Sequence, residues 1–237
     1  MSLLALERVT KRGRRGRVSR ALLRDISLDV ELGQFVSVWC VDGLERAMLA
    51  RVAAGVERPD DGVVKLDGVE LQHALAEERR GRLRFVEPYS AAAAGNTVLS
   101  YVQMPLLARG AAPRHAAERA AASLARVGVS ALAELCVEDL DATEQARVAV
   151  AEALASEPQI IVLDDPTRQV DLLARGSIVR LLRSIADEGV AVLMTTSEAI
   201  GVAGVDRVLT LRDGKLRADV SAPVAEVVPL PARTLRS

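Results

Sequence analysis

The chain has 237 residues, of which 50% are hydrophobic and 27% are charged, and its formal net charge is −1 at pH 7. This composition is sufficient for a globular core, and the overall charge does not favour nucleic acid or a membrane surface as a partner. No apolar run reaches the roughly 18 residues of a membrane-spanning helix, and the N-terminus lacks the order of a secretory signal, so we expect a cytoplasmic protein.

The N-terminal third predicts small antiparallel strands. Residues 3–9 and 21–31 alternate in hydrophobicity as strands do, and the basic segment Lys11 to Arg20 between them is expected to be a loop at the tip of a hairpin. Nucleic-acid binding by this segment is a weak hypothesis because it has no aromatic residues for base stacking. The Asp-Gly pairs at 61–62 and 67–68 are typical turns around one more short strand.

A strand, a short loop and a helix are predicted between Phe35 and Gly62. Residues 35–40 form an apolar run of strand length, and residues 46–54 have one apolar helical face. A strand that leads through a short glycine-containing loop into a helix directs backbone N–H groups and the positive end of the helix dipole at one point. This stretch is therefore the expected place of a phosphate-binding loop.

The rest of the chain alternates between strands and helices. After the strand at 83–86 the composition changes to Ala, Leu and Arg, with helical spacing at 97–107 and 116–127, which predicts an inserted helical subdomain over about residues 88–154. The remaining expected elements are strands at 160–163, 190–195 and 205–211 and a helix at 172–186. Strands that alternate with helices predict a parallel sheet covered on both faces.

The cysteines and histidines indicate no metal site or disulfide. Cys40 and Cys136 lie far apart in apolar surroundings and are expected to be reduced core thiols. His73 and His115 are the only histidines, and neither belongs to a cluster of potential ligands.

Three segments resemble the ATP-binding subunits of ABC transporters, and the resemblance covers almost the whole chain. VERPDDGVVKLDG at 56–68 is similar to the segment after that family's P-loop helix, IIVLDDPTRQVD at 160–171 to its Walker B and D-loop region, and VDRVLTLRDGKL at 205–216 to its C-terminal strands. The closest pattern is that of the branch for lipoprotein release and macrolide export.

The resemblance implies a fold and a domain organisation. The fold is α/β, with a P-loop NTPase (RecA-like) core, a small antiparallel β subdomain and an inserted helical subdomain. This nucleotide-binding domain would span residues 1–220, and residues 221–237 would form a loosely ordered tail.

Several positions that bind phosphate in the family hold other residue types here. The two P-loop glycines are Cys40 and Glu45, the lysine is an arginine, and the hydroxyl residue that binds Mg²⁺ is an alanine. The resemblance thus assigns four residues to a degenerate nucleotide-binding loop: Gly43, Arg46, Ala47 and Met48. Of these, Arg46 keeps a positive charge but presents a guanidinium in place of a compact ammonium group.

The acidic motif after residue 160 is retained in part. Asp164 matches the family's Mg²⁺-side acid, and Asp165, one methylene shorter, stands at the position of the catalytic glutamate. Asp171 matches the D-loop aspartate. The signature motif is replaced by Leu140, Asp141, Ala142, Thr143 and Glu144.

Three further contacts expected in the family lack their usual side chains. The Q-loop glutamine is Pro88, the switch histidine is Thr196, and the adenine-stacking aromatic residue would fall near Gly13. Together with the altered loop, these replacements remove most of the electrostatic stabilisation that phosphoryl transfer requires. We therefore expect weak or absent ATP hydrolysis, with at most weak binding of ATP and Mg²⁺.

Two helix starts have the D-x-x-E spacing of a capping box: Asp42 with Glu45, and Asp141 with Glu144. In such a box the Asp side chain accepts from the third helical N–H and the Glu side chain accepts from the cap residue's N–H. We expect these carboxylates to cap the two helices that would face ATP phosphates, and their charge to repel a triphosphate.

Two functions are compatible with this sequence. The first is an ATP-binding subunit of an ABC transporter, located at the inner face of the cell membrane, in a homodimer or in a heterodimer with another nucleotide-binding subunit. It would couple to or regulate a transmembrane permease, contacted near residues 87–105. The alternative is a non-enzymatic pseudo-ATPase that serves as a scaffold or regulatory adaptor.

Overall fold

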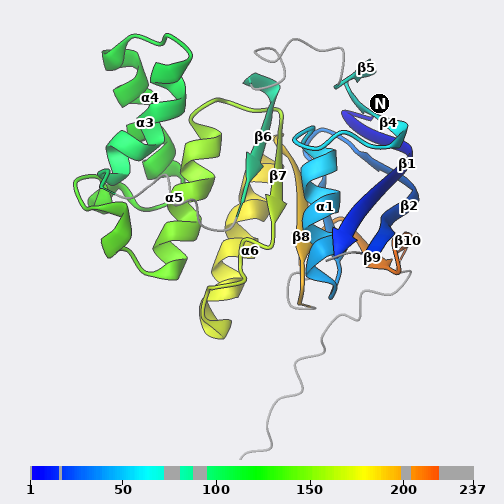
Figure 1. The fold of residues 1–237 in the computed structure, drawn as a ribbon. Helices are drawn as coiled ribbons and strands as arrows, with labels where there is room; N and C mark the ends of the chain where they lie inside the picture. The colour runs from blue at the N-terminus through cyan, green and yellow to red at the C-terminus, as the bar shows by residue number, and fades with distance from the viewer. Residues whose placement is uncertain (1, 16–17, 72–80, 88–94, 199–203, 219–237) are drawn as a thin grey trace, which may run out of the picture.

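The computed structural model describes residues 2–15, 18–71, 81–87, 95–198 and 204–218, which fold into two sheets and their covering helices (Figure 1). The larger sheet has the strand order β10-β9-β3-β8-β7-β6 and is parallel except for β10. Its strands are β3 (Phe35–Trp39), β6 (Leu83–Val86), β7 (Ile160–Asp164), β8 (Ala191–Thr196), β9 (Arg207–Arg212) and β10 (Lys215–Ala218). Every residue of β7 and β8 is buried, as expected for central parallel strands covered on both faces.

The smaller sheet is antiparallel, with the strand order β2-β1-β4-β5. Its strands are β1 (Leu4–Arg15), β2 (Val18–Val30), β4 (Asp61–Leu66) and β5 (Val69–Glu70). The loop predicted over Lys11 to Arg20 is therefore wrong, because the strand pairing continues through Arg12 opposite Ala21 and Gly13 opposite Arg20. Backbone pairing at the end of a two-stranded ribbon needs no apolar side chains, so the hydrophobic alternation stops before the strands do.

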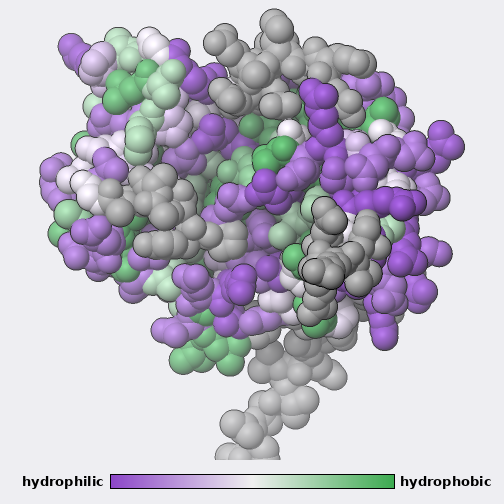
Figure 2. All heavy atoms as spheres, in the orientation of Figure 1, coloured by the Kyte–Doolittle hydropathy of each residue, from purple (hydrophilic) through white to green (hydrophobic). Residues whose placement is uncertain are grey.

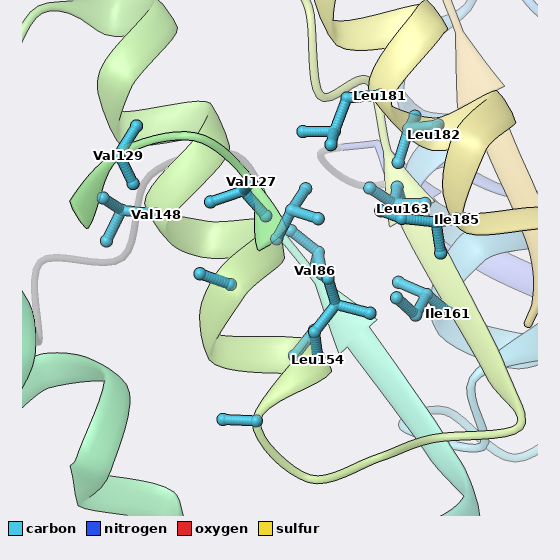
Figure 3. Close-up of a cluster of buried hydrophobic side chains, with 14 of the residues drawn as sticks. Val86, Val127, Val129, Val148, Leu154, Ile161, Leu163, Leu181, Leu182 and Ile185 are labelled. Carbon is cyan, nitrogen blue, oxygen red and sulfur yellow. The ribbon is translucent and has the colours of Figure 1, made fainter. Parts of the chain in front are cut away.

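The helices fall into two groups, which cover opposite faces of the larger sheet (Figure 1). Helix α1 (Gly43–Ala53) packs with the small sheet in one hydrophobic core. Helices α3 (Val98–Ala108), α4 (Pro113–Arg126), α5 (Ala142–Leu154) and α6 (Leu172–Asp187) belong to the other core. Figure 3 shows part of this second core, in which Leu154 of α5 and Ile185 of α6 pack beside Ile161 of β7.

Local signals set the ends of these helices. Thr97 caps α3 by accepting from Ser100 N, and Pro113 occupies the first position of α4, where a missing N–H costs nothing. Gly128, with φ of +77°, follows α4 in the left-handed conformation that ends many helices. Helix α1 begins at Gly43, three residues before the predicted start, because Asp42 caps it.

The predicted fold class is confirmed, with a parallel core, an antiparallel sheet and a group of helices between β6 and β7. The subdomain limits at about 88–154 stay a prediction, since residues 88–94 lie outside the described part of the chain, as do His73, Pro88 and the tail 221–237. Cys40 is buried and Cys136 half-buried, and both are free thiols. Among the described helices, none has the length and hydropathy to cross a membrane.

Candidate functional site

The candidate site lies where the parallel strands end and the next helices begin. Open α/β sheets bind ligands at the carboxyl ends of their strands. Here β3 ends at Trp39 next to the start of α1, and β7 ends at Asp164. In Figure 1 these ends lie toward the lower part of the view. A groove of about 500 Å³ at this place is lined by the start of α1, Asp164 and Arg168.

The start of α1 is capped by Asp42. Its Oδ1 accepts from Leu44 N at 2.9 Å and from Glu45 N at 3.2 Å, and its Oδ2 accepts from Arg20 Nη2 at 2.5 Å. Partial burial opposes the ionisation of Asp42, but the hydrogen bonds from Arg20 and the two backbone N–H groups outweigh it and lower the pKa of this carboxyl. The backbone donors that would face a phosphate in this frame are thus occupied by the protein's own carboxylate.

Glu45 does not complete the predicted capping box. Its carboxylate is buried and accepts from Gly214 N, in the turn between β9 and β10, at 3.1 Å. Arg20 Nη2 lies 3.5 Å from the other oxygen of Glu45. The predicted capping box is therefore confirmed for Asp42 and wrong for Glu45. The Glu45 carboxylate binds the backbone of the C-terminal β-hairpin instead of the N–H of Asp42.

Arg46 holds the two acids at the end of β7. Its Nε donates to Asp164 Oδ1 at 3.0 Å, and its Nη1 lies 3.4 Å from Asp165 Oδ2. The three side chains are almost fully buried, with exposed fractions of 6% for Arg46, 9% for Asp164 and 1% for Asp165. We call this buried group of one cation and two anions the Arg46 clasp.

Each acid of the Arg46 clasp also accepts from a hydroxyl group. Thr195 Oγ1 donates to Asp164 Oδ1 at 3.0 Å, and Ser197 Oγ donates to Asp165 Oδ2 at 2.8 Å. Asp165 has a φ of +47°, a left-handed conformation that aspartate tolerates better than most residues. These contacts satisfy the charges that burial would otherwise destabilise.

The arrangement does not fit a bound Mg²⁺ ion. Mg²⁺ takes a near-octahedral shell of water, carboxylate and phosphate oxygens, but Arg46 pairs with both carboxylates, and Ala47, at the position of the family's hydroxyl residue, has no side-chain oxygen. A Cβ atom at Gly13, the position of the family's adenine-stacking residue, would lie 2.2 Å from Leu22 Cδ1, so a side chain there would require Leu22 to move.

The segment after β8 is joined to the clasp and to α6. Trp39 Nε1 donates to the carbonyl of Ser197 at 3.2 Å, and Ser197 in turn contacts Asp165. Arg175, in the first turn of α6, pairs with Glu198 and donates through Nε to the carbonyl of Val170 at 2.7 Å. The position of the family's switch histidine, Thr196, is buried within this network.

The capping box predicted at the start of α5 is confirmed. Asp141 Oδ1 accepts from Glu144 N at 2.8 Å, and Glu144 Oε2 accepts from Asp141 N at 3.0 Å. Of the other signature-position residues, Leu140 is buried just before this cap, and Ala142 and Thr143 form the first turn of α5. Ala142 and Asp165 line one small cavity of about 60 Å³ between α5 and the segment after β7.

The structure brings together only part of the predicted site. Arg46 contacts Asp164 and Asp165, and Gly43 and Ala47 line the same groove. Met48 instead packs against the core beneath the small sheet. Asp171 lies before α6 with no side-chain cap bond.

Sequence reasoning missed two contributors to this site. Arg20 was assigned to a loop, whereas the structure places it in β2, where its guanidinium donates to Asp42. Ser197 carries no signal of its own, since a single serine after a strand is common. Only the folded chain shows that its hydroxyl reaches Asp165.

Comparison with known proteins identifies the family of this chain. The family model described as ABC transporter matches residues 23–168. The lipoprotein-releasing system ATP-binding protein LolD of Chromohalobacter salexigens is 32% identical over 222 residues, which cover 92% of this chain and 94% of that protein. The macrolide export ATP-binding/permease protein MacB of Rhodospirillum rubrum is 32% identical over 209 residues, covering 86% of this chain and 32% of that longer protein.

A solved structure supports the same assignment. A dimeric bacterial ABC transporter cassette superposes with a TM-score of 0.78 at 25% identity, covering 91% of this chain and 98% of its own. Both relatives fall in the branch for lipoprotein release and macrolide export, as the sequence pattern predicted. The chain belongs to the ABC transporter family, as an ATP-binding cassette.

Proposed function

We propose that this chain is the cassette subunit of an ABC transporter, that it associates with a transmembrane permease at the inner face of the cell membrane, and that it does not hydrolyse ATP at an appreciable rate. Family membership supports the first part, because ATP-binding subunits of this family pair with permeases and form dimers. The permease contact is expected near residues 87–105, at the start of the helical group.

The Arg46 clasp is the observation that supports loss of hydrolysis. Phosphoryl transfer in P-loop proteins depends on a metal ion that neutralises developing charge and on a side chain that positions the attacking water. In this chain both candidate acids are paired with a buried guanidinium. Asp165 would have to leave both Arg46 and Ser197 before it could act as a base.

Weak binding of ATP is proposed on the same grounds. Asp42 and Glu45 place two carboxylates at the start of α1. Asp42 also accepts from two backbone N–H groups of the first helical turn, those of Leu44 and Glu45. A triphosphate would have to displace these contacts and overcome the repulsion between like charges. We infer that any residual ATP affinity does not depend on Mg²⁺, because the metal-side acid is already neutralised.

Contact with a second cassette subunit is supported by an exposed apolar end of α6. Leu172 and Leu173 follow the D-loop position Asp171 and are 60% and 98% exposed. Figure 2 shows hydrophobic surface at the lower end of α6, on a face that is otherwise mainly hydrophilic. Contiguous exposed leucines are typical of a contact between proteins.

The alternative is a scaffold or regulatory adaptor with no ATP-dependent step. The same clasp supports it, since neither the clasp nor the helix caps needs a ligand.

An ATPase assay of the purified chain, alone and with its permease, tests the proposal. We expect no turnover above background in either case. Turnover that Asp165→Asn abolishes would overturn the proposed loss of hydrolysis, and copurification with a permease separates a transporter subunit from an adaptor that acts elsewhere.

A further inference from the structure

A second groove, of about 380 Å³, lies between the C-terminal end of α4, helix α5 and helix α6. Three arginines and two serines contribute to its lining, and no carboxylate does: Arg126, Arg147, Arg180, Ser177 and Ser184. It shares no lining residue with the groove at the start of α1. Figure 3 shows two of its apolar lining residues, Val127 directly after α4 and Leu181 on α6.

The three guanidinium groups are unequally compensated. Arg126 pairs with Glu188, and Arg147 Nη1 donates to the carbonyl of Val127, at the end of α4, at 2.6 Å. Arg180 is exposed and has no ion-pair partner within the described part of the chain. The groove therefore keeps an excess of positive charge, from the half-buried Arg147 and the exposed Arg180.

Gly176 lies on α6 beside the guanidinium of Arg180, one residue before the lining residue Ser177. It lies inside α6 with no positive φ, so no turn requires glycine there, and a glycine within a helix is less favourable than alanine. A Cβ atom at Gly176 would lie 3.3 Å from Arg180 Nη1, closer than such atoms usually approach. The missing side chain thus leaves room for the guanidinium of Arg180 against the helix.

We propose that this groove binds a phosphate-bearing anion through Arg180 and Arg147, with the hydroxyl of Ser177 as a further donor. Guanidinium groups match phosphate oxygens with paired, charge-assisted hydrogen bonds. The phosphate belongs either to a soluble phosphorylated molecule or to the headgroup of an anionic lipid, and both have the same recognition chemistry.

Two probes test the site on the full chain. Calorimetry with inorganic pyrophosphate reports the soluble source, and cosedimentation with phosphatidylglycerol vesicles, compared with phosphatidylcholine vesicles, reports the lipid source. Arg180→Gln should weaken binding of the effective probe by about tenfold. The control is Arg114→Gln, which removes the same charge from an exposed position of α4 outside the groove, and it should change binding much less.

Gly176→Ala separates the groove from a general charge effect. It leaves all charges in place and should raise the melting temperature, because alanine favours the helix. Its Cβ atom would lie 3.3 Å from Arg180 Nη1, so the guanidinium has to shift by a few tenths of an ångström, and the loss of binding should be smaller than in Arg180→Gln. Pyrophosphate heat that disappears in Arg180→Gln supports a soluble ligand, and vesicle binding that disappears supports a lipid. Failure of the wild-type chain to bind either probe, or equal losses in Arg180→Gln and Arg114→Gln, would overturn the proposal.

Discussion

At the scale of single residues, Arg46 determines the state of the site. It stands where the family has a lysine, yet it points to Asp164 and Asp165 rather than to an open phosphate position. A buried ion pair contributes little net stability compared with apolar residues, but removing one partner leaves the other charge uncompensated. Replacing one residue of the Arg46 clasp should therefore lower the stability of the fold by more than the net contribution of the clasp.

Replacing Arg46 by methionine should lower the free energy of unfolding by about 3 to 5 kcal/mol, because two buried carboxylates lose their cation. Added Mn²⁺ should then raise the melting temperature of Arg46→Met, since an ion that binds only the folded state stabilises it, and it should leave wild type unchanged. Thermal melts with and without Mn²⁺ provide the measurement. Arg168→Met is the matched control, since Arg168 lines the same groove and is exposed; Mn²⁺ stabilisation of wild type would contradict the account.

Removal of the cap at Asp42 should have an effect that depends on pH. Asp42→Ala should cost roughly 0.5 to 2 kcal/mol at neutral pH. Because the folded-state pKa of Asp42 is lowered, its contribution is present above the unfolded pKa of about 3.9 and is lost as pH falls through the folded value. Urea denaturation at pH 7 and at pH 3 should show the difference between variant and wild type shrinking with acid. Glu134→Ala, which removes a carboxylate at another exposed position, should show little difference at either pH.

At the scale of elements, a half-buried ion pair joins the larger sheet to the helical group. Arg84 of β6 pairs with Glu152 of α5, and both side chains are about 15% exposed. Burial raises the pKa of Glu152 despite the charge of Arg84, and burial also raises the pKa of the neighbouring Tyr101, on α3, to about 12. This polar contact lies between elements that otherwise meet through apolar packing.

Arg84→Met should therefore destabilise the fold by about 3 kcal/mol at pH 8, when Glu152 is charged and unpaired. An acid whose pKa is raised on folding loses stability as pH rises from its unfolded value toward its folded value. The deficit of the variant relative to wild type should consequently be smaller at pH 5 than at pH 8. Arg114→Met breaks an exposed pair with Glu118 and should cost less than about 0.5 kcal/mol at both pH values.

At the scale of the whole molecule, the sequence predicted the order of strands and helices well and the contacts of the site poorly. The apolar run at residues 160–163 has the length and composition of a buried strand, and the family frame placed Asp164 correctly at the end of that strand. The clasp joins residues 118 positions apart, and Glu45 meets Gly214 across 169 positions. Spacing over a few residues cannot predict such distant pairs. The capping box at Asp141 and Glu144 is local and was predicted in full, whereas the distant partner of Glu45 was not.

Dimerisation is also a property of the whole molecule. Leu173→Asp should weaken self-association, or association with another cassette subunit, because it places a charge on the exposed apolar end of α6. Sedimentation of the subunit with its permease measures the stoichiometry. Leu32→Asp changes a leucine that is 60% exposed elsewhere and should leave assembly intact. If both variants assemble like wild type, the end of α6 is not the contact.

The most direct test of the Arg46 clasp is calorimetric titration of ATP with and without Mg²⁺. We compare wild type with the restored loop Glu45→Gly, Arg46→Lys and Ala47→Ser, in which the clasp is removed and the Mg²⁺ hydroxyl returns. The account predicts weak binding by wild type that is unaffected by Mg²⁺, and a gain of affinity in the restored loop that requires Mg²⁺. Tight, Mg²⁺-dependent binding by wild type would contradict it.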